Sequence, residues 1–183
     1  MKKVTFVLIF LLAVCFVNAA DAKFSLTLGA GMRKVSDNLY KDVYSSNGSA
    51  FSIDLAYKVA NSLQVFLHSD YFTVDGELTL TKEPTTLTIL PIEVGLRLLA
   101  GKNKFRPYIG LGAGYYKYTE ENIIGTMEEN KVGFFGEAGL NFYFVKALFL
   151  DLKVKYIMLK VDGADGEITL GGLGLFGGIG ISF

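Results

Sequence analysis

Residues 90–98, LPIEVGLRL, alternate apolar and other side chains with a period of two. Leucine, isoleucine or valine occupies every even position, and the odd positions hold Pro91, Glu93, Gly95 and Arg97. Successive side chains of a β-strand point to opposite faces, so this stretch predicts a strand with one apolar face and one polar face. Two charges on a single face raise the question of what each face contacts.

The same period recurs through the chain from residue 23 onward, and no stretch shows a helical period. It predicts eight strands, in residues 23–34, 51–59, 63–72, 90–98, 105–116, 132–144, 148–158 and 172–183. Short connections near residues 60–62, 101–104 and 145–147 alternate with longer ones near 35–49, 74–85, 119–130 and 160–167. Short turns at one end and long loops at the other are typical of outer-membrane barrels.

Ten charged residues of the predicted strands share one face. This set is Asp54, Lys58, Asp70, Glu93, Arg97, Arg106, Glu137, Asp151, Lys153 and Lys155. The same face carries aromatic residues opposite glycines, which would promote aggregation on a water-exposed wall but would fill a narrow lumen. The other face is apolar along all eight strands and suits lipid, where a Lys or Arg at mid-depth costs about 2–4 kcal/mol.

This distribution favours a lipid-facing barrel over the alternative, a soluble barrel with the apolar face inside. Closure into a barrel leaves no sheet edge and satisfies every backbone polar group, as the membrane interior requires. We therefore predict an all-β, eight-stranded, antiparallel up-and-down transmembrane β-barrel that spans residues 23–183.

The first 22 residues, MKKVTFVLIFLLAVCFVNAADA, have a different pattern. Two lysines precede an apolar run from Val4 to Val17, and small residues follow. This order predicts a secretory signal peptide with cleavage after Ala19, Ala20 or Ala22. The only cysteine lies in this run, so the mature chain is expected to have no disulfide or thiol chemistry. The zero formal net charge gives no reason to expect nucleic-acid binding.

The last strand contains a G-x-G-x-x-G pattern in Gly172, Gly174 and Gly177. A dinucleotide-binding loop follows a strand and opens a helix within a βαβ unit. Here the glycines lie inside a strand, and the sequence ends six residues after Gly177. The pattern therefore predicts a glycine-rich strand, and we expect no cofactor.

Catalytic and metal-binding patterns are also weak. His68 is the only histidine, which excludes a metal site built from several histidines. Ser69 is adjacent in the strand and so points to the opposite face from His68, which disfavours a Ser–His–acid arrangement. We expect His68 to be a lumen residue hydrogen-bonded to Asp70 or a neighbour, with no catalytic residue and no metal site.

The whole mature chain resembles the small outer-membrane barrel family of the OmpA, OmpX and OmpW types. The resemblance rests on the signal peptide, the eight strands, the stretch RPYIGLGAGYY in the fifth strand and the final aromatic residue. It implies location in the cell outer membrane, contact with lipid and lipopolysaccharide, and both termini in the periplasm. Phe183, Ile181 and Ile179 resemble the signal that the barrel-assembly machinery reads. We expect a monomer.

The charged lumen face predicts either a packed electrostatic plug or a path for protons or ions. Eight strands leave an interior wide enough for side chains or one small ligand, and the inward aromatic residues occupy that space. We therefore favour a plugged lumen and a structural or surface-interaction role without catalysis. Two alternatives stay open, a small OmpW-like channel for ions or apolar molecules and a lipid-modifying outer-membrane enzyme.

Overall fold

The computed structural model describes residues 22–35, 43–44, 47–77, 82–101, 104–123, 125–163 and 166–183. The predicted signal peptide, apart from Ala22, lies outside these residues. No helix among the described residues is long and apolar enough to cross a membrane.

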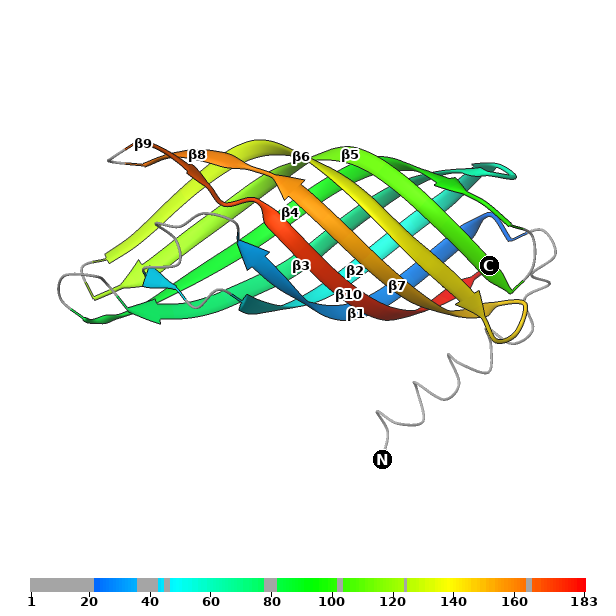
Figure 1. The fold of residues 1–183 in the computed structure, drawn as a ribbon, viewed down its shortest axis with the longest axis horizontal. Coiled ribbons are helices and arrows are strands. Elements are labelled where there is room, and N and C mark those ends of the chain that lie inside the picture. The colour runs from blue at the N-terminus through cyan, green and yellow to red at the C-terminus, as the bar shows by residue number, and fades with distance from the viewer. Residues whose placement is uncertain are drawn as a thin grey trace, which may run out of the picture.

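Eight long strands form one closed antiparallel barrel in the order β1-β10-β7-β6-β5-β4-β3-β2 (Figure 1). The prediction of an eight-stranded up-and-down barrel is confirmed. The strands are β1 (Phe24–Val35), β2 (Asn47–Ala60), β3 (Leu63–Glu77), β4 (Pro84–Leu99), β5 (Phe105–Asn122), β6 (Gly125–Tyr143), β7 (Leu148–Met158) and β10 (Gly172–Ser182).

The first and last strands close the barrel. β1 pairs with β10 from Ser25 opposite Ser182 to Val35 opposite Gly172. The backbone groups of Phe24 and Phe183 exchange two hydrogen bonds of 2.9 Å, and their rings stack with centroids 6.0 Å apart. This end of the barrel also carries the connections β2–β3, β4–β5 and β6–β7, so we call it the turn end and the opposite end the loop end.

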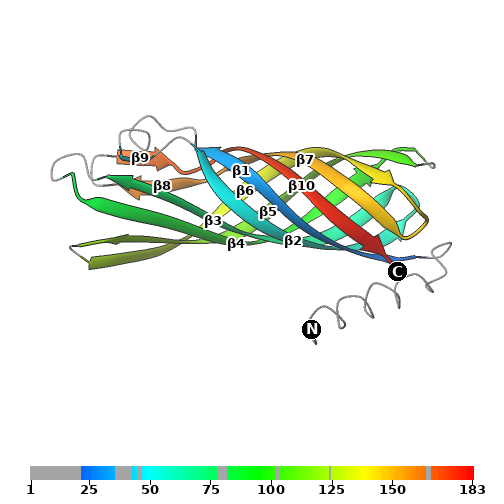
Figure 2. The ribbon, with the colours of Figure 1, turned by 90° about the horizontal axis from the view of Figure 1, so that it is seen from below.

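The strands run further at the loop end than the sequence predicted (Figure 2). Pairing of β3 with β4 continues to Glu77 opposite Pro84, and pairing of β5 with β6 continues to Asn122 opposite Gly125. Within the predicted loop at 160–167, β8 (Lys160–Gly163) pairs with β9 (Gly166–Thr169). Outside the lipid the outward face need not be apolar, so the polarity pattern fades although the backbone pairing continues.

Side chains on the outer face form an apolar belt around all eight strands. Ile109 and Leu111 of β5 are 63% and 67% exposed, and Val94 of β4 is 56% exposed. Exposed apolar residues of the other strands include Leu28, Met32, Ile53, Leu55, Val65, Leu67, Val132, Phe134, Leu152, Val154, Leu175 and Ile179. A continuous apolar surface of this extent requires a covering, and lipid supplies it.

Inside the barrel, aromatic rings pack against glycines of the neighbouring strands. A methyl group added at Gly95 would lie 2.7 Å from the ring of Phe66, and one added at Gly112 would lie 2.7 Å from the ring of Phe135. Side chains at these glycines would displace the rings, so the glycines on the lumen face make room for the aromatic filling.

Candidate functional site

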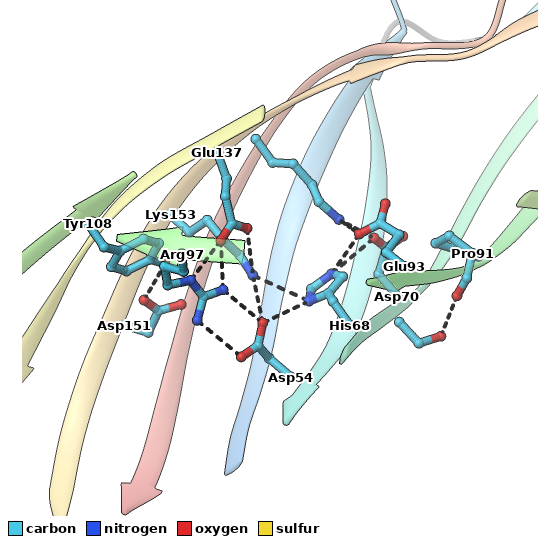
Figure 3. A network of polar contacts seen from close by, with 12 residues as sticks. Asp54, His68, Asp70, Pro91, Glu93, Arg97, Tyr108, Glu137, Asp151 and Lys153 are labelled. Atoms are coloured by element: carbon cyan, nitrogen blue, oxygen red, sulfur yellow. Dashed lines mark hydrogen bonds and ion pairs between the residues drawn. The ribbon is translucent and has the colours of Figure 1, made fainter. Parts of the chain in front are cut away.

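Arg97 of β4 occupies the middle of the lumen (Figure 3). Its Nε donates a hydrogen bond of 2.8 Å to Glu137 Oε1, and its Nη2 donates one of 3.0 Å to Asp54 Oδ2. The guanidinium also lies over the rings of Phe66 and Tyr108, 4.2 Å and 4.4 Å from their centroids. Arg97 is only 4% exposed. This buried cation therefore connects β4 with β2 and β6 across the lumen.

Two lysines of β7 extend this arrangement. Lys153 Nζ lies 3.7 Å from Asp54 Oδ2 and therefore shares that carboxylate with the arginine. Lys155 Nζ contacts Glu93 Oε2 and lies 3.4 Å from Asp70 Oδ2. All of these side chains are buried. Burial of charges is tolerated where opposite charges and hydrogen bonds satisfy them. Each of these carboxylates faces a cation, although Asp70 Oδ1 accepts no hydrogen bond from the described residues.

His68 connects the two groups of charges (Figure 3). Its Nδ1 lies 3.4 Å from Asp54 Oδ2, and its Nε2 lies 3.4 Å from Asp70 Oδ2. Lys153 Nζ is also 3.4 Å from Nδ1. The expected lumen position of His68 is found, with a carboxylate on either side of the ring.

Buried tyrosines bind two further carboxylate oxygens. Tyr108 donates a hydrogen bond of 2.7 Å to Asp151 Oδ1, and Tyr116 donates one of 2.6 Å to Glu93 Oε1. A polar network therefore crosses the lumen and links β2, β3, β4, β5, β6 and β7. We call it the lumen network, and its members are Asp54, His68, Asp70, Glu93, Arg97, Tyr108, Tyr116, Glu137, Asp151, Lys153 and Lys155.

One part of the lumen network has the composition of a metal site. Ligand atoms of His68, Asp70 and Glu93 lie within 4.8 Å of one another. The Lys155 ammonium contacts both of these carboxylates, so a cation of the protein itself already occupies the position between them.

The structure places the predicted charged set on the lumen face, at two depths along the barrel axis. All but two members belong to the lumen network. Lys58 and Arg106 lie instead near the turn end, where both are partly exposed and line a cavity of about 460 Å³.

Sequence reasoning left Arg33 out of the charged set. Arg33 is fully buried, its guanidinium donates a hydrogen bond of 2.9 Å to the Leu170 carbonyl, and its Cζ lies 5.2 Å from the centre of the Phe72 ring. The signal was present, because Arg33 has the same strand parity as the glycines of β1 that face the lumen.

A layer of buried hydrophobic residues lies on the loop-end side of the lumen network. The sequence did not predict this layer, because it assigned residues 74–85 to a loop. Its buried residues are Val35, Phe72, Val74, Leu87, Ile89, Tyr118, Ile157, Leu159 and Leu170. The lumen parity of Phe72, Val74, Leu87 and Ile89 continues that of the charged residues in β3 and β4.

The Ser69 side chain does not contact His68. The hydroxyl of Ser69 donates a hydrogen bond of 2.7 Å to the carbonyl of Pro91, and the residue lies on the outer face, whereas His68 is 1% exposed in the lumen. The two side chains are therefore on opposite sides of the wall, as the strand geometry predicted.

An apolar outer belt around a lumen lined by polar side chains defines a transmembrane outer-membrane β-barrel. The sequence matches the family described as outer membrane protein beta-barrel domain over residues 6–181. The chain belongs to this family, which confirms the resemblance drawn from the sequence and makes it an outer-membrane protein.

Three solved structures illustrate the likeness of fold. OprG from Pseudomonas aeruginosa is 16% identical with a TM-score of 0.73, over 88% of this chain and 96% of that one. Neisserial surface protein A is 15% identical with a TM-score of 0.67, over 87% and 97%. Ail of Yersinia pestis, solved with the heparin analogue sucrose octasulfate, is 18% identical with a TM-score of 0.61, over 88% and 99%. No curated protein sequence matches the chain.

Proposed function

We propose that this protein is a sealed outer-membrane barrel that acts at the cell surface and catalyses no reaction. The observation that supports a sealed lumen is the combination of two layers across it. The lumen network forms one layer, with Arg97 held between Asp54 and Glu137, and the hydrophobic layer forms the other. A continuous path for ions would have to separate buried ion pairs and then pass through apolar side chains.

The proposed orientation places the turn end in the periplasm and the loop end outside the cell, as in bacterial outer-membrane barrels generally. Export by the predicted signal peptide and recognition of Phe183, Ile181 and Ile179 by the barrel-assembly machinery are parts of this proposal. The apolar belt would contact outer-membrane lipid and lipopolysaccharide, with the barrel as a monomer.

The surface role rests on the part of β6 that projects beyond the closed wall. Residues 125–133 of β6 pair with β5, whereas the pairing of β6 with β7 begins only at Phe134. Among the described residues, no strand pairs with the other edge of this segment. An open strand edge can accept an extended segment of another polypeptide through main-chain hydrogen bonds.

Charge suggests which segments this edge would favour. The β5–β6 hairpin carries Glu120, Glu121, Glu128 and Glu129 near its tip. Lys117 pairs with Glu128 at 2.9 Å, and Tyr118 donates a hydrogen bond of 2.5 Å to Glu129. The acidic excess favours a basic extended segment as the partner, since complementary charge speeds association and disfavours other partners.

The register of the hairpin defines a test. Tyr116 lies opposite Lys131, so residues 117–130, which include most of the open edge and all four glutamates, can be replaced by Asn-Gly, a two-residue turn that suits antiparallel strands. A peptide of alternating lysine and valine should bind cells that display the intact barrel and should not bind cells that display the shortened one. A peptide of alternating glutamate and valine serves as the control. Equal binding of the basic peptide to both barrels would contradict a surface role for the hairpin.

The absence of catalysis is tested at His68, the residue on which the enzyme alternative depends. His68 lies between Asp54 and Asp70 and is buried, with no serine beside it on the lumen face of β3. We expect no change in lipid A acylation when the protein is expressed, and none with His68→Ala. A change that His68→Ala abolishes would support a lipid-modifying enzyme instead.

A further inference from the structure

The turn end of the lumen contains a cavity that the proposed function does not use. The cavity has a volume of about 460 Å³, and Lys58, Gln64 and Arg106 are among the residues that line it. A smaller cavity of about 80 Å³ adjoins it and shares these three residues. The larger volume falls within the range of about 300–1,000 Å³ that is usual for small-ligand sites. We call the two cavities together the vestibule.

The charge of the vestibule is strongly one-sided. Four basic residues line it, namely Lys23, Lys58, Arg106 and Lys146, and no aspartate or glutamate is among its described lining residues. Asn61, Ser62 and Gln64 add side-chain hydrogen-bond donors. A cleft lined by one sign of charge with low-dielectric walls concentrates the field and attracts ions of the opposite sign.

The arginine of the vestibule is held by an aromatic neighbour. Arg106 Cζ lies 4.3 Å from the centre of the Tyr143 ring, and the Tyr143 hydroxyl lies 3.3 Å from Ser182 Oγ. Stacking of this kind fixes the plane of the guanidinium, whose fork of donors matches the oxygens of phosphate groups.

Carboxylates inward of the vestibule have partners in the lumen network. The next inward residues on β2 and β4 are Ala56 and Arg97, and beyond them Asp54 is already engaged by Arg97 and Lys153. Asp151 accepts a hydrogen bond from the Tyr108 hydroxyl. Each of these carboxylates therefore has a partner in the lumen network.

We propose that the vestibule binds a small soluble oxyanion with two or more negative charges, of the pyrophosphate class. Lys58, Gln64 and Arg106 all have lumen parity, so the site opens along the barrel axis and away from the lipid belt. This location favours a soluble phosphate compound over a lipid headgroup, which carries the same chemistry. The proposal does not depend on the surface role of the loop end.

The test is calorimetric titration with sodium pyrophosphate. The protein is expressed from its full sequence, purified from membranes and placed in phosphatidylcholine nanodiscs. One saturable site per barrel is expected. Loss of two charge-assisted contacts in Lys58→Gln/Arg106→Gln should weaken binding by about tenfold or more. The matched control Lys34→Gln/Lys117→Gln removes the same charge at the loop end, and should change affinity by no more than about twofold because its charges lie beyond the screening length.

Folding of each variant is checked by the shift in its electrophoretic mobility on heating. Absence of a saturable site in the wild type, or equal affinity in the wild type and the vestibule variant, would overturn the proposal. Equal loss in both double variants would also overturn it, because a general effect of net charge would then explain binding. A second titration in discs that contain phosphatidylglycerol separates the two sources of phosphate. If phosphatidylglycerol weakens pyrophosphate binding to the wild type but not to the vestibule variant, the site binds a lipid headgroup. This result would overturn the proposal of a soluble ligand.

Discussion

Substitution of Arg97 by methionine tests the energetics of the lumen network. The change keeps a long side chain in place but removes the hydrogen bonds to Glu137 and Asp54 and the contacts with the Phe66 and Tyr108 rings. Two carboxylates would then share the remaining cation, Lys153. Removal of one partner from a buried ion pair costs about 3–5 kcal/mol, and we expect a decrease in the free energy of unfolding of this size.

A double-mutant cycle isolates the interaction from the loss of packing. Glu137→Gln removes the carboxylate charge, and the double variant Arg97→Met/Glu137→Gln no longer contains an unpaired glutamate. Residues in one buried network couple by about 0.5–3 kcal/mol, so the double variant should be less destabilised than the sum of the single variants, by an amount near the upper value. The coupling should persist in high salt, because buried pairs are screened little.

The measurement is urea unfolding in lipid vesicles, followed by far-UV circular dichroism because the chain contains no tryptophan. The control cycle uses Lys117 and Glu128, which form an ion pair of 2.9 Å with side chains 44% and 53% exposed. Exposed pairs contribute about 0–1 kcal/mol, and this coupling should fall as salt is added. A cost below about 1 kcal/mol for Arg97→Met, or a coupling no larger than that of the control, would refute a tightly paired lumen network.

Three further predictions concern the wall and its assembly, and the first two use the same unfolding measurement. Val94→Lys places a charge in the middle of the apolar belt and should destabilise the barrel by about 2–4 kcal/mol in vesicles. Gly139→Ala should cost about 1–3 kcal/mol, since the added methyl group meets the ring of Tyr108 and the carbonyl of Leu152. Phe183→Ala should lower the amount of folded barrel in the outer membrane, measured by heat-modifiable mobility, while the refolded protein stays stable.

Matched controls accompany these substitutions. Thr126→Lys introduces the same charge in the projecting part of β6 and should be nearly neutral, so equal costs at residues 94 and 126 would contradict the lipid-facing assignment. Gly136→Ala makes the same change in the same strand as Gly139, but the nearest atom to its added methyl group is the Gly110 carbonyl at 3.9 Å. Normal assembly of Phe183→Ala would exclude a role for the terminal residue as a signal.

The sequence alone was sufficient to predict the barrel, for a physical reason. Lipid demands an apolar outer face over the full height of the membrane, so residues such as Ile92, Val94 and Leu96 repeat without interruption. The same parity assigned Asp54 and Arg97 to the lumen without knowledge of any contact. Strand parity could not predict which lumen side chains contact one another, because contacts across the lumen depend on barrel closure and strand register.

The sequence was less informative where the lipid constraint ends. Beyond the membrane the outward face becomes polar, so Val74 was assigned to a loop, and Leu87 and Ile89 fell outside the predicted strands. These residues belong to the hydrophobic layer, which changes the picture of the lumen from a wholly charged interior to a charged layer beside an apolar one. The vestibule was missed for a related reason, since Lys58 and Arg106 share the parity of the lumen network but lie at another depth.

The central claim, a sealed lumen, is tested most directly by conductance of the purified wild-type barrel in planar lipid bilayers with concentrated potassium chloride. The lumen network and the hydrophobic layer predict no defined openings at moderate voltage, even when insertion is verified by heat-modifiable mobility in the same preparation. Reproducible unitary openings of the wild-type barrel would contradict a sealed lumen and would favour a small channel instead.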